Sequence, residues 1–284
     1  MSTEIYYFSG TGNSLFAAKE LQKRLSESRL LPIAGLLQKG GVKTQGKAVG
    51  LIFPVHALTI PIAVKRFVRM ADFESADYIF AVATRLGTVF RGFEEIDRLL
   101  RKKGKRLSAG FIINMGNNEA RHENYAVPTR AELLALETAA HDKLAGIAET
   151  AQRREISREK DVEYTIGFGK GDIMNFLLEK TVLSGLDFCE HIGGVQYFYS
   201  NPACTGCGVC EKVCLSGKIS MKDGKPVWNK KVLCYMCFAC LNYCPVRAVQ
   251  IKDIPGVKSY TEQNGRYPHP YAAVNDIAAQ KRTQ

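Results

Sequence analysis

The chain has 284 residues, of which 46% are hydrophobic and 24% are charged, and its formal net charge is +11. This length and composition predict a soluble globular protein of about two domains with a buried core. No window of 18 apolar residues without charge occurs, and residues 1–10 lack the basic start and apolar stretch of a signal peptide, so we expect a cytoplasmic protein without a transmembrane segment.

The positive charge is concentrated in the last third of the chain. Residues 201–284 contain twelve Lys and Arg against five Asp and Glu, a net charge of +7. Such a region favours a partner with an acidic docking surface. The Lys and Arg residues are scattered rather than arranged in a stripe, so we do not expect nucleic acid as a partner.

The chain begins with a pattern that is typical of phosphate binding. Residues 4–9 form an apolar, aromatic strand, residues 9–14 form a loop rich in Gly and hydroxyl groups, and a helical pattern continues to Leu25. The N–H groups of a helix start and a Gly-rich backbone can hold a terminal phosphate. The loop lacks the Lys of a P-loop and the third Gly of a dinucleotide loop, which favours a monophosphate. The alternative is an ordinary turn in which Ser or Asn caps the helix.

Strands and helices alternate through the first half of the chain. Further strands are predicted at 30–34, 48–53, 78–84 and 109–114, and helices are predicted to start at Pro61, to span about 89–103, and to follow a capping box of Thr129 and Glu132. This alternation predicts an α/β fold with a doubly wound, five-stranded parallel sheet. Ligands of such sheets bind at the carboxyl ends of the strands, so we expect loops 9–14, 54–59, 84–88 and 114–118 to meet at one edge.

Residues 152–200 fit neither half of the chain. A charged linker is predicted at 152–161, and a helix that is apolar on a broad face is predicted within 171–189. We interpret the segment as a spacer between two domains, and a docking surface for a partner or a membrane is the alternative. Cys189 lies outside the cysteine pattern of the next segment, and we expect it to be a small buried hydrophobic residue.

Eight of the nine cysteines form two runs with the same spacing, C-x2-C-x2-C-x3-C, and the second run follows the first at an offset of 30 residues. This regularity indicates an internal duplication. In two-cluster bacterial ferredoxins the fourth cysteine of each run binds the cluster of the other run. We therefore assign one 4Fe-4S cluster to Cys204, Cys207, Cys210 and Cys244, and a second to Cys234, Cys237, Cys240 and Cys214.

Disulfides and zinc are the alternatives for these cysteines. Disulfides require an oxidising compartment, for which residues 1–10 give no signal. Zinc ribbons pair two C-x2-C units and leave the triple spacing unexplained. Within the same region, Asp223 and Gly224 predict a hairpin turn, residues 249–251 predict a strand, and the polar tail from Gly256 is expected to wrap a domain surface.

The predicted domains are therefore residues 1–151, a spacer at 152–200, a cluster domain at 201–255 and a tail at 256–284. Residues 6–14, Tyr-Tyr-Phe-Ser-Gly-Thr-Gly-Asn-Ser, resemble the phosphate loop of flavodoxins. With the cysteine runs and the tail segment 265–270, nearly the whole chain resembles the flavodoxin-ferredoxin fusion proteins of anaerobic bacteria and archaea. The resemblance implies a flavodoxin-like domain that binds FMN and a small α+β bacterial two-cluster ferredoxin-like domain.

The resemblance also implies which residues bind FMN. Its phosphate would be held by the side chains of Ser9, Thr11, Asn13 and Ser14 and by the backbone of Gly10 and Gly12. Its ring would lie between two loops, represented by Pro54, Val55 and His56, and by Thr84, Arg85 and Gly87. Neither loop supplies the Trp or Tyr that flavodoxins often stack on the ring. His56 would cover a ring face or be an ordinary surface histidine, and Arg85 would stabilise the reduced, anionic ring or face solvent.

The sequence therefore predicts an electron-transfer flavo-iron-sulfur protein that passes electrons between FMN, two 4Fe-4S clusters and an external redox protein. The alternatives are an FMN-dependent reductase of a small oxidant, and an electron-entry subunit or redox sensor of a larger complex. No acid–base pair or nucleophile stands out, so no catalytic residue is predicted and the enzyme class stays open.

Overall fold

The computed structural model describes residues 2–56, 58–87, 90–160, 198–253 and 257–282, together with residues 177, 181, 184 and 185. Most of the helix predicted within 171–189, and Cys189, lie outside the described residues. None of the described helices combines the length and the hydropathy that crossing a lipid bilayer requires.

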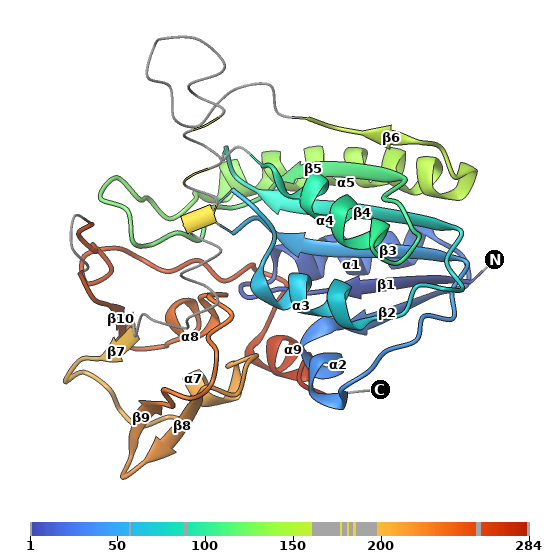
Figure 1. Cartoon of the computed structure of the whole chain (residues 1–284). Coiled ribbons are helices and arrows are strands. Elements are labelled where there is room, and N and C mark those ends of the chain that lie inside the picture. Colours follow the sequence, from blue (N-terminus) through green and yellow to red (C-terminus); the bar gives the residue numbers. More distant parts are fainter. Residues whose placement is uncertain are drawn as a thin grey trace.

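The N-terminal half is built on one parallel sheet whose strands follow the order β2-β1-β3-β4-β5-β6 (Figure 1). Its strands are β1 (Thr3–Tyr7), β2 (Ser28–Pro32), β3 (Ala48–Pro54), β4 (Tyr78–Arg85), β5 (Ala109–Asn114) and β6 (Ser157–Arg158). The order 2-1-3-4-5 is that of the flavodoxin-like doubly wound fold. The predicted fold class is therefore confirmed, and the predicted strands at 48–53, 78–84 and 109–114 are confirmed with it.

Three details of the predicted sheet are wrong. The first strand, predicted at residues 4–9, spans Thr3–Tyr7. The second strand begins and ends two residues earlier than predicted, because Pro32 precedes the first turn of helix α2 (Ile33–Lys39). The sheet has a sixth strand, since β6 pairs with β5 inside the segment predicted as a linker. This strand has only two, exposed residues, so it shows no apolar alternation that a sequence pattern could reveal.

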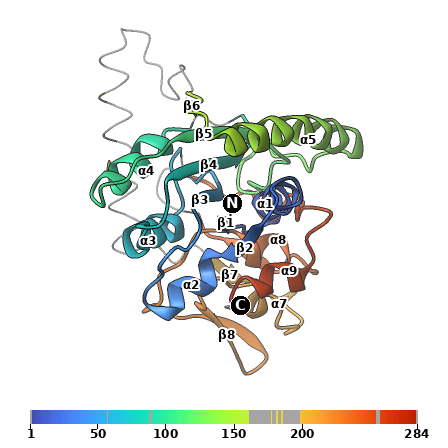
Figure 2. The same cartoon turned by 90° about the vertical axis from the view of Figure 1, so that its right-hand side faces the viewer.

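Helices cover both faces of the sheet, as a doubly wound fold requires. Figure 2 shows α1 (Asn13–Arg24) and α5 (Arg130–Arg153) on one face, and α3 (Ile62–Met70) and α4 (Gly92–Arg101) on the other. Residues 48–53 of β3 and 78–84 of β4 are all buried, which explains their nearly continuous apolar sequences. Thr129 and Glu132 form the predicted capping box at the start of α5.

The cluster domain contains two short antiparallel sheets and two single-turn helices. One sheet is the predicted hairpin of β8 (Ile219–Lys222) and β9 (Lys225–Trp228), and the helices are α7 (Val209–Lys212) and α8 (Ala239–Asn242). The other sheet pairs the predicted strand β10 (Val249–Ile251) with β7 (Phe198–Ser200). Strand β7 thus lies within the predicted spacer 152–200 and pairs with a strand of the predicted cluster domain.

The backbone of the cluster domain repeats at the same offset as its cysteines. Left-handed residues occur at Gly206, Gly208 and Gly217 in the first half, and 30 positions later in the second half at Met236, Phe238 and Arg247. A side chain in this conformation is strained, and the cost is about 1 kcal/mol. The second half thus accepts strain to keep the same turns, which supports the internal duplication.

We expect an Asp97→Asn substitution to destabilise the sheet edge that carries β6. The Asp97 side chain is 6% exposed, and its carboxylate accepts hydrogen bonds from the Leu107 N–H (2.9 Å), from Arg158 (2.9 Å) and from Arg101 Nε (2.9 Å). An amide keeps only one acceptor oxygen and cannot satisfy all three donors, so the free energy of unfolding should fall by about 2 kcal/mol, measured by urea unfolding at pH 7. The control is Asp77→Asn, whose long ion pairs are half-exposed and should contribute little.

The effect of Asp97→Asn should depend on pH. Burial raises the pKa of Asp97, but the Leu107 N–H and the Arg158 and Arg101 guanidinium groups outweigh it and leave the pKa below its ordinary value. The carboxylate therefore stabilises the fold fully above the ordinary Asp pKa of about 4. This contribution is lost as the pH falls through the lowered pKa, so the difference between wild type and variant should shrink there. A difference that grows on acidification would contradict the assignment.

Candidate functional site

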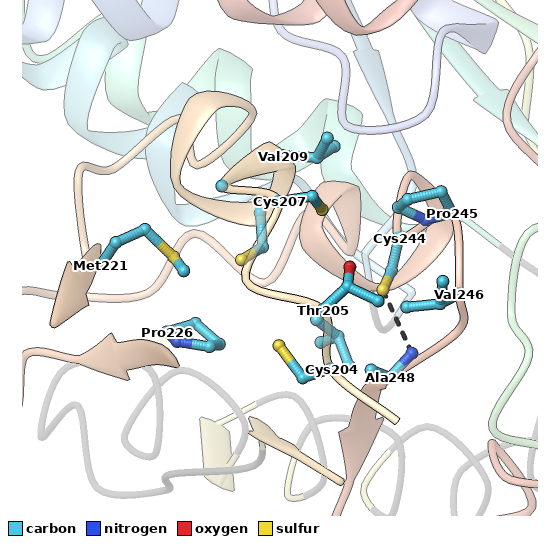
Figure 3. A pocket seen from close by; sticks show the side chains of 13 residues that line it. Cys204, Thr205, Cys207, Val209, Met221, Pro226, Cys244, Pro245, Val246 and Ala248 are labelled. Atoms are coloured by element: carbon cyan, nitrogen blue, oxygen red, sulfur yellow. Dashed lines mark hydrogen bonds between the residues drawn. The ribbon is translucent and has the colours of Figure 1, made fainter. Parts of the chain in front are cut away.

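The four predicted ligands of the first cluster lie around one pocket of the C-terminal domain (Figure 3). Apart from these cysteines the pocket walls are mainly small or apolar, and they include Met221, Pro226 and Val249. Cys210 is buried and Cys207 is exposed. The lining cysteines are Cys204, Cys207, Cys210 and Cys244, which come from both halves of the duplication.

The other four cysteines form a second group, which lies deeper in the molecule. Its members are Cys214, Cys234, Cys237 and Cys240. The thiols of Cys234 and Cys214 are electrostatic neighbours of both Cys237 and Cys240. Cys240 is also within electrostatic range of Cys210, which belongs to the first group. The structure thus brings together the two sets of four that the spacing predicts, and no disulfide joins any of these eight cysteines.

The thiols are in surroundings that disfavour a negative charge without a counter-ion. Burial, and secondarily nearby thiols, raise the pKa of Cys210 to about 11 and that of Cys237 to about 12. A thiolate there needs a nearby cation, and iron provides one. Two sulfur atoms also accept backbone hydrogen bonds, Cys234 from the Met236 N–H (3.4 Å) and Cys244 from the Ala248 N–H (3.1 Å). Bonds of this kind tune the potential of a cluster, so the residues fit the group.

The predicted phosphate loop lies at the carboxyl edge of the sheet, between β1 and α1. All six residues, 9–14, are buried. Gly12 takes a left-handed conformation (φ 108°), and the first turn of α1 receives no hydrogen bond from a capping side chain. The alternative of a turn in which Ser or Asn caps the helix is therefore wrong, and the N–H groups of this turn are available to an anion.

The hydroxyl groups of the loop are oriented by protein donors. Ser9 Oγ accepts from the Gly12 N–H (3.1 Å), and Thr11 Oγ1 accepts from Asn118 Nδ2 (2.5 Å). Ser14 Oγ and Thr84 Oγ1 lie 2.7 Å apart and share a hydrogen bond. A hydroxyl that accepts from the protein keeps its own hydrogen for another acceptor, such as a phosphate oxygen. Hydroxyl donors, an uncapped helix start and a left-handed Gly together fit a monophosphate.

Asn13 has a buried acceptor that a bound ligand could satisfy. Its Nδ2 donates to the Gly116 carbonyl (2.8 Å), whereas its buried Oδ1 has no hydrogen-bond partner in the described part of the chain. A buried acceptor without a donor is costly, so its presence calls for an explanation. A hydroxyl of a bound nucleotide would supply the donor.

The loops predicted to flank the ring meet at the same edge. The Val55 N–H donates to the Thr84 carbonyl (2.9 Å), and His56 and Thr59 exchange two backbone hydrogen bonds. Among the predicted ring residues, Thr84 is buried, Gly87 is exposed, and Pro54, Val55, His56 and Arg85 are half-buried. Burial lowers the pKa of the His56 imidazole to about 4.

An aromatic residue that the sequence analysis did not single out reaches this edge from the cluster domain. Tyr235 follows the predicted cluster ligand Cys234, is 7% exposed, and packs edge-on against Phe8 (ring centroids 6.0 Å). Phe8 in turn packs against His56 (6.2 Å). A continuous set of rings therefore leads from a predicted ring loop to the second group of cysteines. The sequence signal for such a residue is the lack of Trp and Tyr in loops 54–59 and 84–88, which leaves an aromatic contact to another part of the chain.

The phosphate loop and the second group of cysteines are in direct backbone contact. A Cβ atom on Gly10 would overlap the carbonyl oxygen of Cys237. Asn242 Nδ2 adds a hydrogen bond to the Asn118 carbonyl (3.3 Å), and the Tyr243 hydroxyl lies within reach of the Thr11 carbonyl (3.3 Å). The resemblance implies a role for Gly10 in phosphate binding only, and the close approach of Cys237 is the reason that no side chain fits there.

Comparison with known proteins gives a family match within the C-terminal half and similar solved structures for the N-terminal half. Residues 203–249 match the family model of the 4Fe-4S dicluster domain, which favours clusters over zinc or disulfides. A solved flavodoxin variant from Pseudomonas aeruginosa is 20% identical, with a TM-score of 0.36, over 54% of this chain and 99% of its own. Rubredoxin oxygen:oxidoreductase from Desulfovibrio gigas is 15% identical, with a TM-score of 0.31, over 53% of this chain and 37% of its own.

A WrbA-like flavodoxin from Agrobacterium tumefaciens is 14% identical, with a TM-score of 0.33, over 54% of this chain and 99% of its own. The search of curated proteins found no significant match. The fold assignment of the N-terminal half therefore rests on its own strand order and connections.

We expect a Gly10→Ala substitution to loosen the contact between the two halves. The new methyl group would meet backbone atoms, which cannot move aside by changing rotamer, so the cost should be about 1–3 kcal/mol. Amide hydrogen exchange in residues 234–243 should accelerate by about tenfold or more. The control is Gly41→Ala, where no atom lies within 4 Å of the added methyl group. Equal exchange in the two variants would contradict the close contact.

Proposed function

Because the chain joins a flavodoxin-like sheet to a 4Fe-4S dicluster domain, the combination found in flavodoxin-ferredoxin fusion proteins, we propose that it is an electron-transfer protein carrying FMN and two clusters. It would pass electrons between these centres and an external redox protein. When bound, FMN exchanges one or two electrons and each 4Fe-4S cluster exchanges one, so the set couples two-electron to one-electron chemistry.

The chain's own residues would bind and separate these groups. Residues 9–14 would hold the phosphate, and loops 54–59 and 84–88 would flank the ring. The residues proposed to ligate the clusters are Cys204, Cys207, Cys210 and Cys244 for the first, and Cys234, Cys237, Cys240 and Cys214 for the second. The apolar walls around the cysteines would limit the access of water, which influences the potential of a cluster.

The observation that carries the proposal is the contact of Gly10 with Cys237. It supports a direct neighbourhood of the phosphate loop and the second cluster, within one folded unit. An enzyme in which the flavin reacts separately from the clusters would not need this close approach. The Phe8–Tyr235 contact at the same boundary supports the same conclusion.

The external partner would dock near the first cluster, where Cys207 is exposed. Lys225 Nζ donates to the Cys204 carbonyl (2.7 Å), and Lys222 is exposed on the same hairpin. Positive charge next to a cluster attracts an acidic protein surface and accelerates the encounter. We therefore propose that the partner presents acidic residues to the β8–β9 hairpin.

Anaerobic purification followed by iron, sulfide and flavin analysis tests the cofactors. We expect about eight irons and about one FMN per chain. Cys207→Ala should retain FMN and fall to about four irons, because it removes one ligand of the first cluster only. Cys189→Ala is the control and should keep about eight. Wild-type protein without flavin, or with four irons or fewer after full reconstitution, would overturn the proposal, and a Cys207→Ala variant with eight irons would overturn the ligand assignment.

The docking surface can be tested with an anionic oxidant. Oxidation of the dithionite-reduced protein by ferricyanide should slow as salt is added, since opposite charges attract less when screened. The double substitution Lys222→Gln/Lys225→Gln should lower the rate at low salt and flatten the salt dependence, as measured by stopped-flow absorbance. The control, Lys102→Gln/Arg106→Gln, removes the same charge at the amino edge of the sheet. It should leave the rate at low salt and the salt dependence unchanged. Equal effects of the two double variants would contradict docking at the hairpin.

A further inference from the structure

The C-terminal tail contacts the backbone of the phosphate loop at two points. Gln280 follows helix α9 (Val274–Ala279) and is 0% exposed. Its side-chain amide forms two hydrogen bonds with one residue, since Nε2 donates to the Ser9 carbonyl (2.8 Å) and Oε1 accepts from the Ser9 N–H (3.0 Å). Ser9 is the first residue of the loop, 271 positions away in the sequence.

The second point of contact is His269. Its N–H donates to the Thr11 carbonyl (2.7 Å), and its ring stacks on Phe16 of α1 (ring centroids 4.8 Å). A Cβ on Gly12 would overlap Ala272 and His269, so the tail lies directly on the loop. The Tyr243 hydroxyl lies between the Thr11 carbonyl (3.3 Å) and the Ala272 carbonyl (2.7 Å), and so connects loop, cluster domain and tail.

These contacts determine the direction of the loop's N–H groups. In a trans peptide the C=O of one residue and the N–H of the next point in opposite directions. Holding the Ser9 carbonyl on the tail side therefore directs the Gly10 N–H away from the tail. Holding the Thr11 carbonyl directs the Gly12 N–H in the same way, and that N–H donates to Ser9 Oγ.

A loop with two glycines is otherwise expensive to order. Gly loses more conformational freedom on ordering than any other residue, and a ligand that has to order its site binds more weakly. Contacts that already hold the backbone remove this cost before the anion arrives. The tail contacts are well suited to this role, because their hydrogen bonds to the loop use its backbone carbonyl and N–H groups and not its hydroxyls.

We propose that the tail clamp, formed by Gln280 and His269, preorganises residues 9–14 for a monophosphate, and that Gln280 is a positioning residue for the phosphate of the nucleotide. This inference rests on the proposed function, since it concerns the same site. The expected consequence is a selective loss: a weakened clamp should reduce the affinity for FMN, which has the phosphate, more than the affinity for riboflavin, which lacks it.

The test measures FMN and riboflavin binding by fluorescence quenching, with the full-length, cluster-loaded chain freed of flavin. Gln280→Ala should weaken FMN binding about tenfold, because two hydrogen bonds to Ser9 are lost, and should leave riboflavin binding nearly unchanged. Arg282→Ala is the matched control, because its exposed side chain lies on the same tail, and should change neither affinity. Iron content and the thermal transition show whether each variant is folded.

Tyr243→Phe provides a second, nearly isosteric variant in case Gln280→Ala does not fold. It removes the hydroxyl between Thr11 and Ala272, and should weaken FMN binding about two- to threefold with little effect on riboflavin. Parallel losses of both flavins, or no loss of either, would overturn the inference and leave the proposed function standing. A wild-type chain that binds neither flavin would overturn the proposed function itself.

Discussion

The arrangement of the whole molecule depends on one close approach of two backbones. The first glycine of the loop after β1 lies against the carbonyl of a cysteine in the second cluster motif, at a distance that no side chain would allow. Because backbone atoms cannot change rotamer, this contact fixes the position of the cluster domain more strictly than packed side chains would. The carboxyl edge of the sheet, where doubly wound folds bind their ligands, is thereby placed next to the segment that carries Cys237. Figure 1 shows the cluster domain, with α8, beside this edge.

The consequence is that three segments far apart in the sequence surround the proposed nucleotide site. The loop at 9–14 provides the uncapped helix start and the hydroxyl donors, the cluster domain provides the Cys237 backbone and the Tyr235 ring, and the tail provides Gln280 and His269. In an isolated flavodoxin-like domain this edge would face solvent. Here the loop is buried, so the proposed cofactor site and the packing of the domains share the same contacts.

The two halves of the cluster domain have the same backbone conformation at positions where their residues differ. Three left-handed positions are glycines in the first half and Met236, Phe238 and Arg247 in the second. The turns between cysteines have to follow the same path around each cluster, so the backbone conformation persists although the favourable residue does not. The fourth cysteine of each half lies with the three of the other, which ties the halves together and explains why neither is a separate domain.

Patterns local in sequence determined much of this protein by themselves. Apolar runs specify β3 and β4, the spacing of the cysteines specifies the two groups of thiols, Asp223 and Gly224 specify the hairpin, and the order of elements specifies a doubly wound sheet. Only the tertiary structure decided the contacts between distant residues whose own sequence neighbourhood shows no pattern that predicts the contact. Strand β6 forms because the exposed residues Ser157–Arg158 pair with β5 and Arg158 binds Asp97. Strand β7 pairs with β10 of the cluster domain. Gln280 forms hydrogen bonds with Ser9, near the other end of the chain. A periodic pattern reports how one element buries its face, whereas pairing between distant elements depends on the packed geometry of both, which no single segment encodes.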